Sequence, residues 1–423
     1  MNKIKKSTRY FLYSFLTIVI ALNLFILLSG RIYLYSGIMK TYAIGKSGPG
    51  IYDLDVFPHS TIEQSKEPYL WKKHTRFNKF TFDKFERKYH QRLGTKAFLV
   101  FKNDTLLFEK YFGAHNQETV SNSFSAAKTV ISLLIGIAIE EGKIKSVDEP
   151  VGNYLPEFNE NGRNDVTIRN LLLMAAGFDW EESGSNPISH AAEAYYGDDL
   201  YGLVTRQYVV EKPGTKFNYQ SGDSQLLGFI LQKATGKSIS EYTEEKLWKP
   251  MGAGHKAFWS LDKENGDEKA FCCLYASPRD FSLIGLLLLN QGNIGGKQIA
   301  PKWYIQEMVK TPTLATEENI KNLRYGWHIW TYKNDGNPVY YCRGFRGQYI
   351  MAFPSKQLVV VRLGMEREDN FVIPESKEND RKFHQKYDER VGHSPDLFVY
   401  LKMAEKIEKE IYQNERRTKR TKS

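Results

Sequence analysis

The sequence has little cysteine, and its histidines lack the spacing of metal ligands. Three cysteines occur in 423 residues, and two of them, Cys272 and Cys273, are adjacent. Adjacent cysteines are poorly placed to pair with each other and Cys342 is distant, so no disulfide framework is indicated. We expect the adjacent pair to be small core residues. The nine histidines form no H-x-x-x-H pattern, and we expect neither a metal nor a cofactor.

Net charge is also small over most of the chain. The formal net charge is +10, but residues 3–9 supply +4 and residues 416–422 supply +5, which leaves +1 for everything between. A protein domain with so little net charge attracts nucleic acid only weakly, and we therefore exclude nucleic acid as a partner. The basic tail, residues 414–423, is typical of a disordered end.

Residues 10–29 contain no charged side chain. A helix of this length just crosses a hydrocarbon layer of about 30 Å, and the basic residues before it favour a cytoplasmic N-terminus. No A-x-A-like cleavage site and no lipid-accepting cysteine follow. We therefore expect a retained signal anchor over residues 1–30 in a bacterial cell membrane, with the rest facing the periplasm or cell exterior. A cleaved signal peptide is the alternative.

Hydrophobic patterns predict the elements of the remaining chain. Residues 31–85 read as an irregular arm rich in Gly, Pro, Lys and aromatics. Two strands are expected in 95–113, and further antiparallel strands follow residue 324. Helices are expected at 123–143, 167–178, 224–236, 277–292 and 394–413. Strands near both ends and helices between them predict an α/β (α+β) domain over 86–413, an antiparallel sheet flanked by helices with an inserted all-helical lobe.

The segment SFSAAKTVISLLIGIAIEEGK, residues 123–143, begins with small and polar residues and continues as an apolar helix. It places Lys128 three residues after Ser125, on the same helix face. A desolvated lysine with a lowered pKa can take a proton from a serine nucleophile. The alternative is a capping Ser125 with Lys128 as a surface charge. The same spacing at Ser260 and Lys263 lies in a polar turn, and we interpret it as a chance match.

Several segments, taken in order, resemble the serine β-lactamase and penicillin-binding-protein superfamily, and within it the class C-like serine hydrolases and esterases. These segments are SFSAAKTV, VTIRNLLLMAAGFDW, PGTKFNYQSGDSQLLGFILQKATGK, LYASPRDFSLIGLLLLNQG and RGFRGQYIMAFP. The resemblance covers about residues 90–410. It implies a β-lactamase-like fold, with Ser125 as the nucleophile and Lys128 as its base.

The second family motif resembles Tyr219-Gln220-Ser221. Class C relatives carry Tyr-x-Asn, but Tyr-x-Ser is similar to the 6-aminohexanoate-dimer hydrolases. The resemblance implies that Tyr219 transfers protons and that Ser221 binds Lys128 or the substrate. The alternatives are a buried, hydrogen-bonded tyrosine and an ordinary turn serine. Tyr275-Ala276-Ser277 and Tyr332-Lys333-Asn334 have similar patterns without the flanking segment.

The third family motif, Lys-Thr-Gly or His-x-Gly, resembles Cys342-Arg343-Gly344. No lysine or histidine stands first, so we expect Arg343 to supply the positive charge that binds a substrate carboxylate. An outward-facing arginine is the alternative, because the sequence does not fix strand register. The resemblance implies an oxyanion hole made by the backbone N–H groups of Ser125 and Phe345. Gly344 would allow a close backbone approach there.

These features predict a membrane-anchored serine hydrolase. It would cleave a small-molecule ester or amide through an acyl-enzyme on Ser125, with Lys128 and Tyr219 as acid and base. One alternative is a non-catalytic protein of the same fold that binds cell-wall peptides. The other is a β-lactamase or D-Ala peptidase, which the altered third motif disfavours. Trp180, Tyr195 and Tyr196 are candidates to line the pocket, and the sequence specifies neither the substrate nor the oligomeric state.

Overall fold

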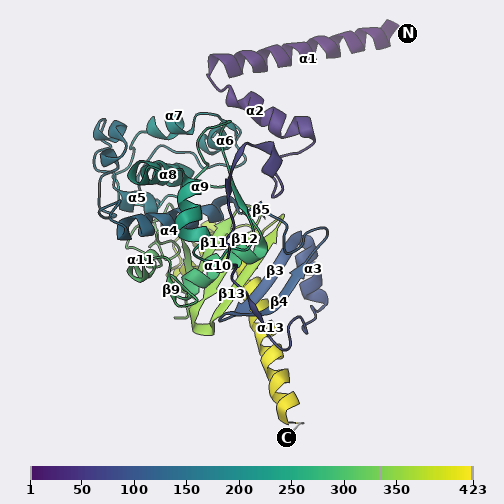
Figure 1. The fold of residues 1–423 in the computed structure, drawn as a ribbon. Helices are drawn as coiled ribbons and strands as arrows, with labels where there is room; N and C mark the ends of the chain where they lie inside the picture. Colours follow the sequence, from purple (N-terminus) through teal and green to yellow (C-terminus); the bar gives the residue numbers. More distant parts are fainter. Residues whose placement is uncertain (1, 334–335, 421–423) are drawn as a thin grey trace.

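The computed structural model describes residues 2–333 and 336–420. Its largest sheet has seven strands in the order β10-β11-β12-β13-β3-β4-β2. The strands are β10 (Trp330–Tyr332), β11 (Val339–Gly344), β12 (Gln348–Phe353), β13 (Leu358–Gly364), β3 (Thr95–Lys102), β4 (Thr105–Tyr111) and β2 (Lys72–Lys73). Neighbours pair antiparallel, except that β2 runs parallel to β4. β13 pairs with β3, so segments from both ends of the chain meet within the sheet (Figure 1), as the sequence predicted.

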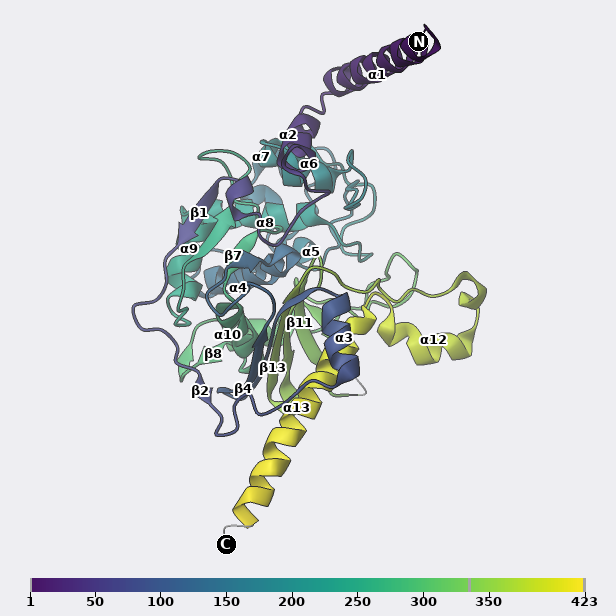
Figure 2. The ribbon, with the colours of Figure 1, turned by 90° about the vertical axis from the view of Figure 1, so that its right-hand side faces the viewer.

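Helices cover both faces of this sheet. Helix α10 (Pro278–Leu289) packs on one face and α13 (Pro395–Arg420) on the other, and α3 (Lys84–Arg92) also packs against β3. Val359 and Val361 of β13 join the core beneath α10, whereas Val360 joins the core beneath α13. The unbroken apolar run of β13 is therefore explained by burial on both sides. Figure 2 shows α13, in yellow, running across the sheet.

The segment between β4 and β10 carries the expected helical lobe. Its helices are α4 (Ala127–Glu140), α5 (Ile168–Leu172), α6 (His190–Tyr196), α7 (Leu200–Thr205), α8 (Ser221–Thr235), α9 (Ile239–Thr243) and α11 (Lys302–Met308). The structure adds a second sheet that the sequence did not predict. Its order is β1 (His59–Ile62), β6 (Ala257–Ser260), β7 (Leu274–Ala276) and β5 (Ser121–Asn122). Strands β8 (Asn293–Ile294) and β9 (Lys297–Gln298) form a separate hairpin.

The boundaries of α8 and α5 differ from the predicted ones. Helix α8 begins at Ser221, three residues earlier than expected. Helix α5 is capped by the Thr167 side chain but ends at Leu172, well before residue 178. The chain leaves the helix because Met174 adopts a left-handed φ of +54°, and the Ala175 N–H closes the helix end by donating to the Asn170 carbonyl. The Met174 carbonyl then accepts a hydrogen bond from the Asn218 N–H. The motif that contains Tyr219 is thereby fixed against the end of α5.

The N-terminal helix α1 (Asn2–Leu28) stands clear of the domain (Figure 1). Its residues 7–28 have a mean hydropathy of 2.5 and are mostly exposed, and in the described part of the chain this is the helix long and apolar enough to cross a membrane. Helix α2 (Tyr33–Lys40) follows after four residues and packs against α6. The Tyr35 hydroxyl donates to Asn23 Oδ1 at 2.6 Å, which joins α2 to α1.

The C-terminal helix is longer than the predicted segment 394–413. Helix α13 continues to Arg420, so the backbone of the basic tail is helical up to that residue. Residues 421–423 of the tail lie outside the described residues. Between β13 and α13 the chain forms α12 (Arg381–Tyr387), which projects from the domain in Figure 2.

Candidate active site

Ser125 lies in a single 3-10 turn, η3 (Phe124–Ala126), directly before α4. Asn122 Oδ1 accepts from the Phe124 N–H at 2.8 Å, and Phe124 has a φ of +46°, so the chain turns sharply just before the serine. The N-cap of α4 is Ala126, which means that Ser125 is not the helix cap. Ser125 is half-buried and borders a cavity of about 880 Å³.

Lys128, in the first turn of α4, is buried, and its amine contacts residues that line this cavity. Its Nζ donates to the Phe271 carbonyl at 2.7 Å, to Ser221 Oγ at 3.1 Å and to Ser125 Oγ at 3.3 Å. Burial lowers the pKa of Lys128 to about 8, while the charges of Glu182 and Asp223 act in the opposite direction. Lys128 is therefore not a solvated surface charge, and a substantial fraction of its amine is neutral near pH 8.

Tyr219 lies on the loop before α8, and its ring centroid is 5.2 Å from Lys128 Nζ. The ring packs against Tyr325 and Trp330. Burial and the charge of Glu182 raise the pKa of Tyr219, whereas a hydrogen bond with Ser125 opposes that shift. The structure thus brings together the three residues predicted to be catalytic, with the tyrosine in its protonated form.

Glu182 is a site residue that the sequence did not predict. It lies on the loop between α5 and α6, and its Oε1 accepts from Ser221 Oγ at 2.6 Å. Its Oε2 accepts from the Ser221 N–H and from Trp180 Nε1, both at 2.7 Å. Ser221 therefore connects Lys128 to a carboxylate. No motif marks Glu182, because this contact depends on how the loop folds back over α8.

Gly344, at the end of β11, is where the sheet meets the Ser125 turn. A Cβ atom added there would lie 2.0 Å from the Ser123 carbonyl oxygen, so the close approach requires glycine. Phe345 follows at the mouth of the cavity with 51% of its surface exposed, and its ring packs edge-on against Phe124. The backbone of Phe345 thus lies beside the Ser125 turn, where the predicted second oxyanion donor would be needed.

Arg343 lines the cavity, whereas its neighbour Cys342 points into the core. Burial raises the pKa of the Cys342 thiol to about 12, so this cysteine is neutral. The Arg343 guanidinium lies 3.4 Å from the centre of the Trp330 ring and donates to Asn370 Oδ1 and the Gly392 carbonyl. The outward-facing alternative for Arg343 is therefore wrong.

Arg367, on the loop after β13, lines the same end of the cavity. Burial, together with the nearby charge of Arg343, lowers its pKa. Arg367 donates to Asn370 Oδ1 at 2.7 Å and to the Glu368 backbone carbonyl. Among the described residues, no carboxylate lies within ion-pair distance of either guanidinium. This end of the cavity therefore holds two positive charges that contact neutral oxygen atoms and, for Arg343, the Trp330 ring, with no carboxylate paired to either among the described residues.

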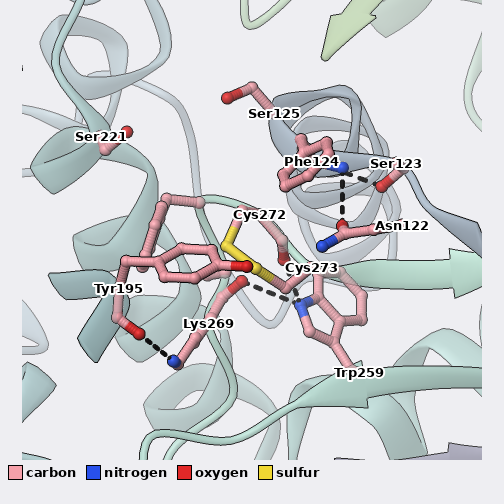
Figure 3. The surroundings of a disulfide bond; sticks show 12 residues. Asn122, Ser123, Phe124, Ser125, Tyr195, Ser221, Trp259, Lys269, Cys272 and Cys273 are labelled. Atoms are coloured by element: carbon pink, nitrogen blue, oxygen red, sulfur yellow. Dashed lines mark hydrogen bonds between the residues drawn. A yellow bond between two sulfur atoms is a disulfide. The ribbon is translucent and has the colours of Figure 1, made fainter. Parts of the chain in front are cut away.

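Cys272 and Cys273 form a disulfide between adjacent residues, which corrects the expectation that they would not pair. Cys273 has a φ of +68°, and this sharp turn of the chain brings the two side chains together. Figure 3 shows the disulfide close to Tyr195 and Trp259. Cys272 lines the cavity, and the carbonyl just before it is the Phe271 acceptor of Lys128.

The other residues singled out in the sequence lie partly at the cavity and partly away from it. Tyr195 and Tyr196 line the cavity, whereas Trp180 acts through its hydrogen bond to Glu182. Ser260 and Tyr275, which belong to the look-alike motifs, are buried in β6 and β7. Tyr332 lies in β10, and Asn334 of its motif is outside the described residues. Within the described residues, no cluster of His, Cys, Asp or Glu could hold a metal ion.

An α+β domain with a cavity-lining serine beside a buried lysine is typical of the serine hydrolases that include the penicillin-recognising enzymes. A family model described as Beta-lactamase matches residues 82–371, more than half of the chain. The chain therefore belongs to this family, and it is a serine hydrolase. The resemblance inferred from the sequence is confirmed.

Individual relatives are distant. The 6-aminohexanoate-dimer hydrolase of Paenarthrobacter ureafaciens is 24% identical over 286 residues, which cover 64% of this chain and 72% of the relative. A protein of Escherichia coli (strain K12), proposed to be a D-alanyl-D-alanine carboxypeptidase, is 24% identical over 298 residues, covering 55% and 67%. A solved structure from Bacillus anthracis, provisionally described as a 6-aminohexanoate-dimer hydrolase, has a TM-score of 0.65 at 21% identity, covering 73% and 86%.

Proposed function

We propose that this protein cleaves an ester or amide bond through an acyl-enzyme on Ser125. The observation that carries the proposal is the 3.3 Å contact between Lys128 Nζ and Ser125 Oγ, made by a lysine whose pKa burial lowers to about 8. The neutral amine accepts the serine proton as Oγ attacks the substrate carbonyl carbon. The 6-aminohexanoate-dimer hydrolase is named for the cleavage of such a substrate, which supports this reaction class.

The other site residues complete the proposed reaction. The backbone N–H groups of Ser125 and Phe345 stabilise the oxyanion of the tetrahedral intermediate. Tyr219, protonated because its pKa is raised, donates a proton to the leaving group. The Lys128 ammonium then returns its proton to Tyr219. Water attacks the acyl carbonyl carbon while the Lys128 amine takes its proton, and that proton passes to Ser125 Oγ as the bond between the acyl group and the serine breaks and the acid leaves. Ser221, held by Glu182, keeps the Lys128 amine directed toward the serine.

We also propose that α1 anchors the protein in a bacterial cell membrane, with the domain on the periplasmic or external side. The apolar residues 7–28 and the basic residues before them support this orientation. The Cys272–Cys273 disulfide supports it as well, because disulfides persist in oxidising compartments.

The test is a pair of serine variants assayed with a 4-nitrophenyl ester and a fluorophosphonate probe. Ser125→Ala should abolish both turnover and labelling. Ser260→Ala is the matched control, since Ser260 starts the chain's other S-x-x-K pattern but lies buried in β6, and it should leave both unchanged. Equal turnover and labelling in Ser125→Ala and wild type would refute the proposal.

A second candidate is a peptidase or β-lactamase whose substrate carries a carboxylate. The observation that favours it is the pair Arg343 and Arg367, two cavity-lining cations without a carboxylate partner among the described residues. Arg343→Gln should then raise KM for a D-Ala-D-Ala peptide or a chromogenic cephalosporin about tenfold and leave a neutral ester unaffected. If no acyl donor forms a mass adduct on Ser125, the protein is instead a binding protein.

A further inference from the structure

The cavity has a second wall that the family match does not include. Helix α2 contributes Leu34 and Ile38 to the cavity lining, and the 3-10 turn that follows it contributes Tyr42, although the family match begins only at residue 82. Of these, Ile38 is 38% exposed and Tyr42 is 70% exposed. The wall is apolar, in contrast to the cationic end beside Arg343 and Arg367.

This wall is fixed to the catalytic elements. The Tyr33 hydroxyl donates to the Pro187 carbonyl at 3.2 Å, on the loop that also carries Glu182. Further along the arm, Arg346 Nε donates to the Pro49 carbonyl at 2.8 Å, directly after Phe345. The Asn122 N–H donates to the Ile51 carbonyl at 2.8 Å, three residues before Ser125. The arm is thus held against the site by specific hydrogen bonds and forms part of its wall.

The wall also lies next to the proposed membrane helix. Four residues separate Leu28 from Tyr33, and four residues span at most about 14 Å. The hydrogen bond from Tyr35 to Asn23 ties α2 to the last turns of α1. The apolar side of the cavity is therefore the side nearest to the end of the membrane-spanning segment.

The position of Tyr219 assigns the two ends of the cavity to the two halves of a substrate. Tyr219 donates to the leaving group, and it packs on Trp330, which also carries the Arg343 guanidinium. The leaving group therefore belongs at the cationic end. The acyl group is left with the walls formed by α2 and by Tyr195 and Tyr196 of α6. Burial of methylene groups against such a surface is favourable.

We propose that the substrate is a membrane-resident amphiphile whose long apolar acyl chain lies against α2 while its ester or amide carbonyl reaches Ser125. This inference rests on the proposed hydrolase function and adds the class of substrate to it. A bilayer-resident acyl chain would enter along the wall that is nearest to its own phase.

The test uses the full-length protein in lipid nanodiscs with 4-nitrophenyl acetate, hexanoate and decanoate. Wild type should show kcat/KM at least tenfold higher for the decanoate than for the acetate. Leu34→Asn and Ile38→Asn should each lower the decanoate value at least fivefold and keep the acetate value within twofold. Met39→Asn is the matched control, since Met39 lies on the same helix with 64% exposed and does not line the cavity.

The outcomes separate the inference from the function on which it rests. A flat chain-length profile, or an equal loss in Leu34→Asn and Met39→Asn, would overturn the acyl-chain inference while the hydrolase stands. A loss of acetate and decanoate turnover in equal proportion would overturn it as well. If no ester shows turnover that depends on Ser125, the proposed function fails and the inference fails with it.

Discussion

Lys128 determines how activity should depend on pH. The proposed reaction needs the neutral amine, and the pKa of Lys128 is about 8. Because the protonated form is inactive, kcat/KM should rise about tenfold per pH unit below pH 8 and level off above it. A profile of 4-nitrophenyl acetate hydrolysis between pH 5.5 and about 9.5 measures this limb. A rate that is independent of pH across this range would argue against Lys128 as the base.

Glu182 should set the position of that limb. Its negative charge stabilises protonated Lys128 and so raises the lysine pKa against the effect of burial. Glu182→Gln keeps an acceptor for Ser221 but removes the charge, so the acid limb should move to lower pH by about half a unit or more. The same pH profile detects the shift. Glu193→Gln on α6, whose carboxylate pairs with Arg206 and does not line the cavity, serves as the control and should leave the limb in place.

At this scale the sequence predicts that Ser125 and Lys128 lie together, but it predicts less about the residues around them. Helix geometry predicts that Ser125 and Lys128 lie on the same face. The family resemblance predicts that Tyr219 lies near them. Glu182 could not be predicted, because its hydrogen bonds to Ser221 are tertiary contacts that depend on how its loop folds. The direction of Arg343 depended on strand register, which side-chain alternation alone leaves open.

Strand β11 and the Ser125 turn should tolerate no added atom between them. Gly344→Ala would place a Cβ 2.0 Å from the Ser123 carbonyl oxygen. The two backbones must then separate, which would move the Phe345 N–H, the proposed second oxyanion donor. We expect a loss of at least tenfold in kcat and of about 1–3 kcal/mol in the free energy of unfolding. Esterase kinetics and urea titration measure the two effects.

The control for this substitution is Gly184→Ala, because an added Cβ at Gly184 meets nothing within 4 Å. Its free energy of unfolding should stay close to that of wild type. Equal stability of the two variants would show that β11 can move away from Ser123 without cost.

The adjacent cysteines give a prediction that does not depend on catalysis. Protein that is unfolded without reductant should take up iodoacetamide on Cys342 alone, because Cys272 and Cys273 are joined. Treatment with reductant before alkylation should raise the intact-mass increment to three labels. Three labels in the absence of reductant would contradict the disulfide.

At the scale of helices and strands, the sequence predicted those elements whose position is determined by a single hydrophobic pattern. The strands β3 and β13 and the helix α4 follow from their runs of apolar residues, and α10 follows from such a run together with its capping Ser277. The early end of α5 did not follow, because it depends on the left-handed φ of Met174. The disulfide was missed for a similar reason, since it depends on the left-handed φ of Cys273.

At the scale of the whole molecule, the predicted sheet and helical lobe are present. The sequence patterns predicted least about the structure of the arm, residues 31–85. It was expected to be irregular because it lacks a periodic apolar pattern. In the structure it contains α2, which packs on α6, and β1, which pairs with β6 of the second sheet. These contacts join residues that are far apart in the sequence, so no local sequence pattern predicts them.

The contacts of this arm determine how far the N-terminus can be shortened to obtain a secreted or soluble version of the protein. A chain shortened to start at Ser29 loses only the apolar helix and retains α2, the Pro49 contact of Arg346 and the pairing of β1 with β6. A chain cut back to the family match at residue 82 discards all three and opens the cavity on one side. Choosing the boundary by homology alone would therefore yield a different enzyme from the one that the cell carries.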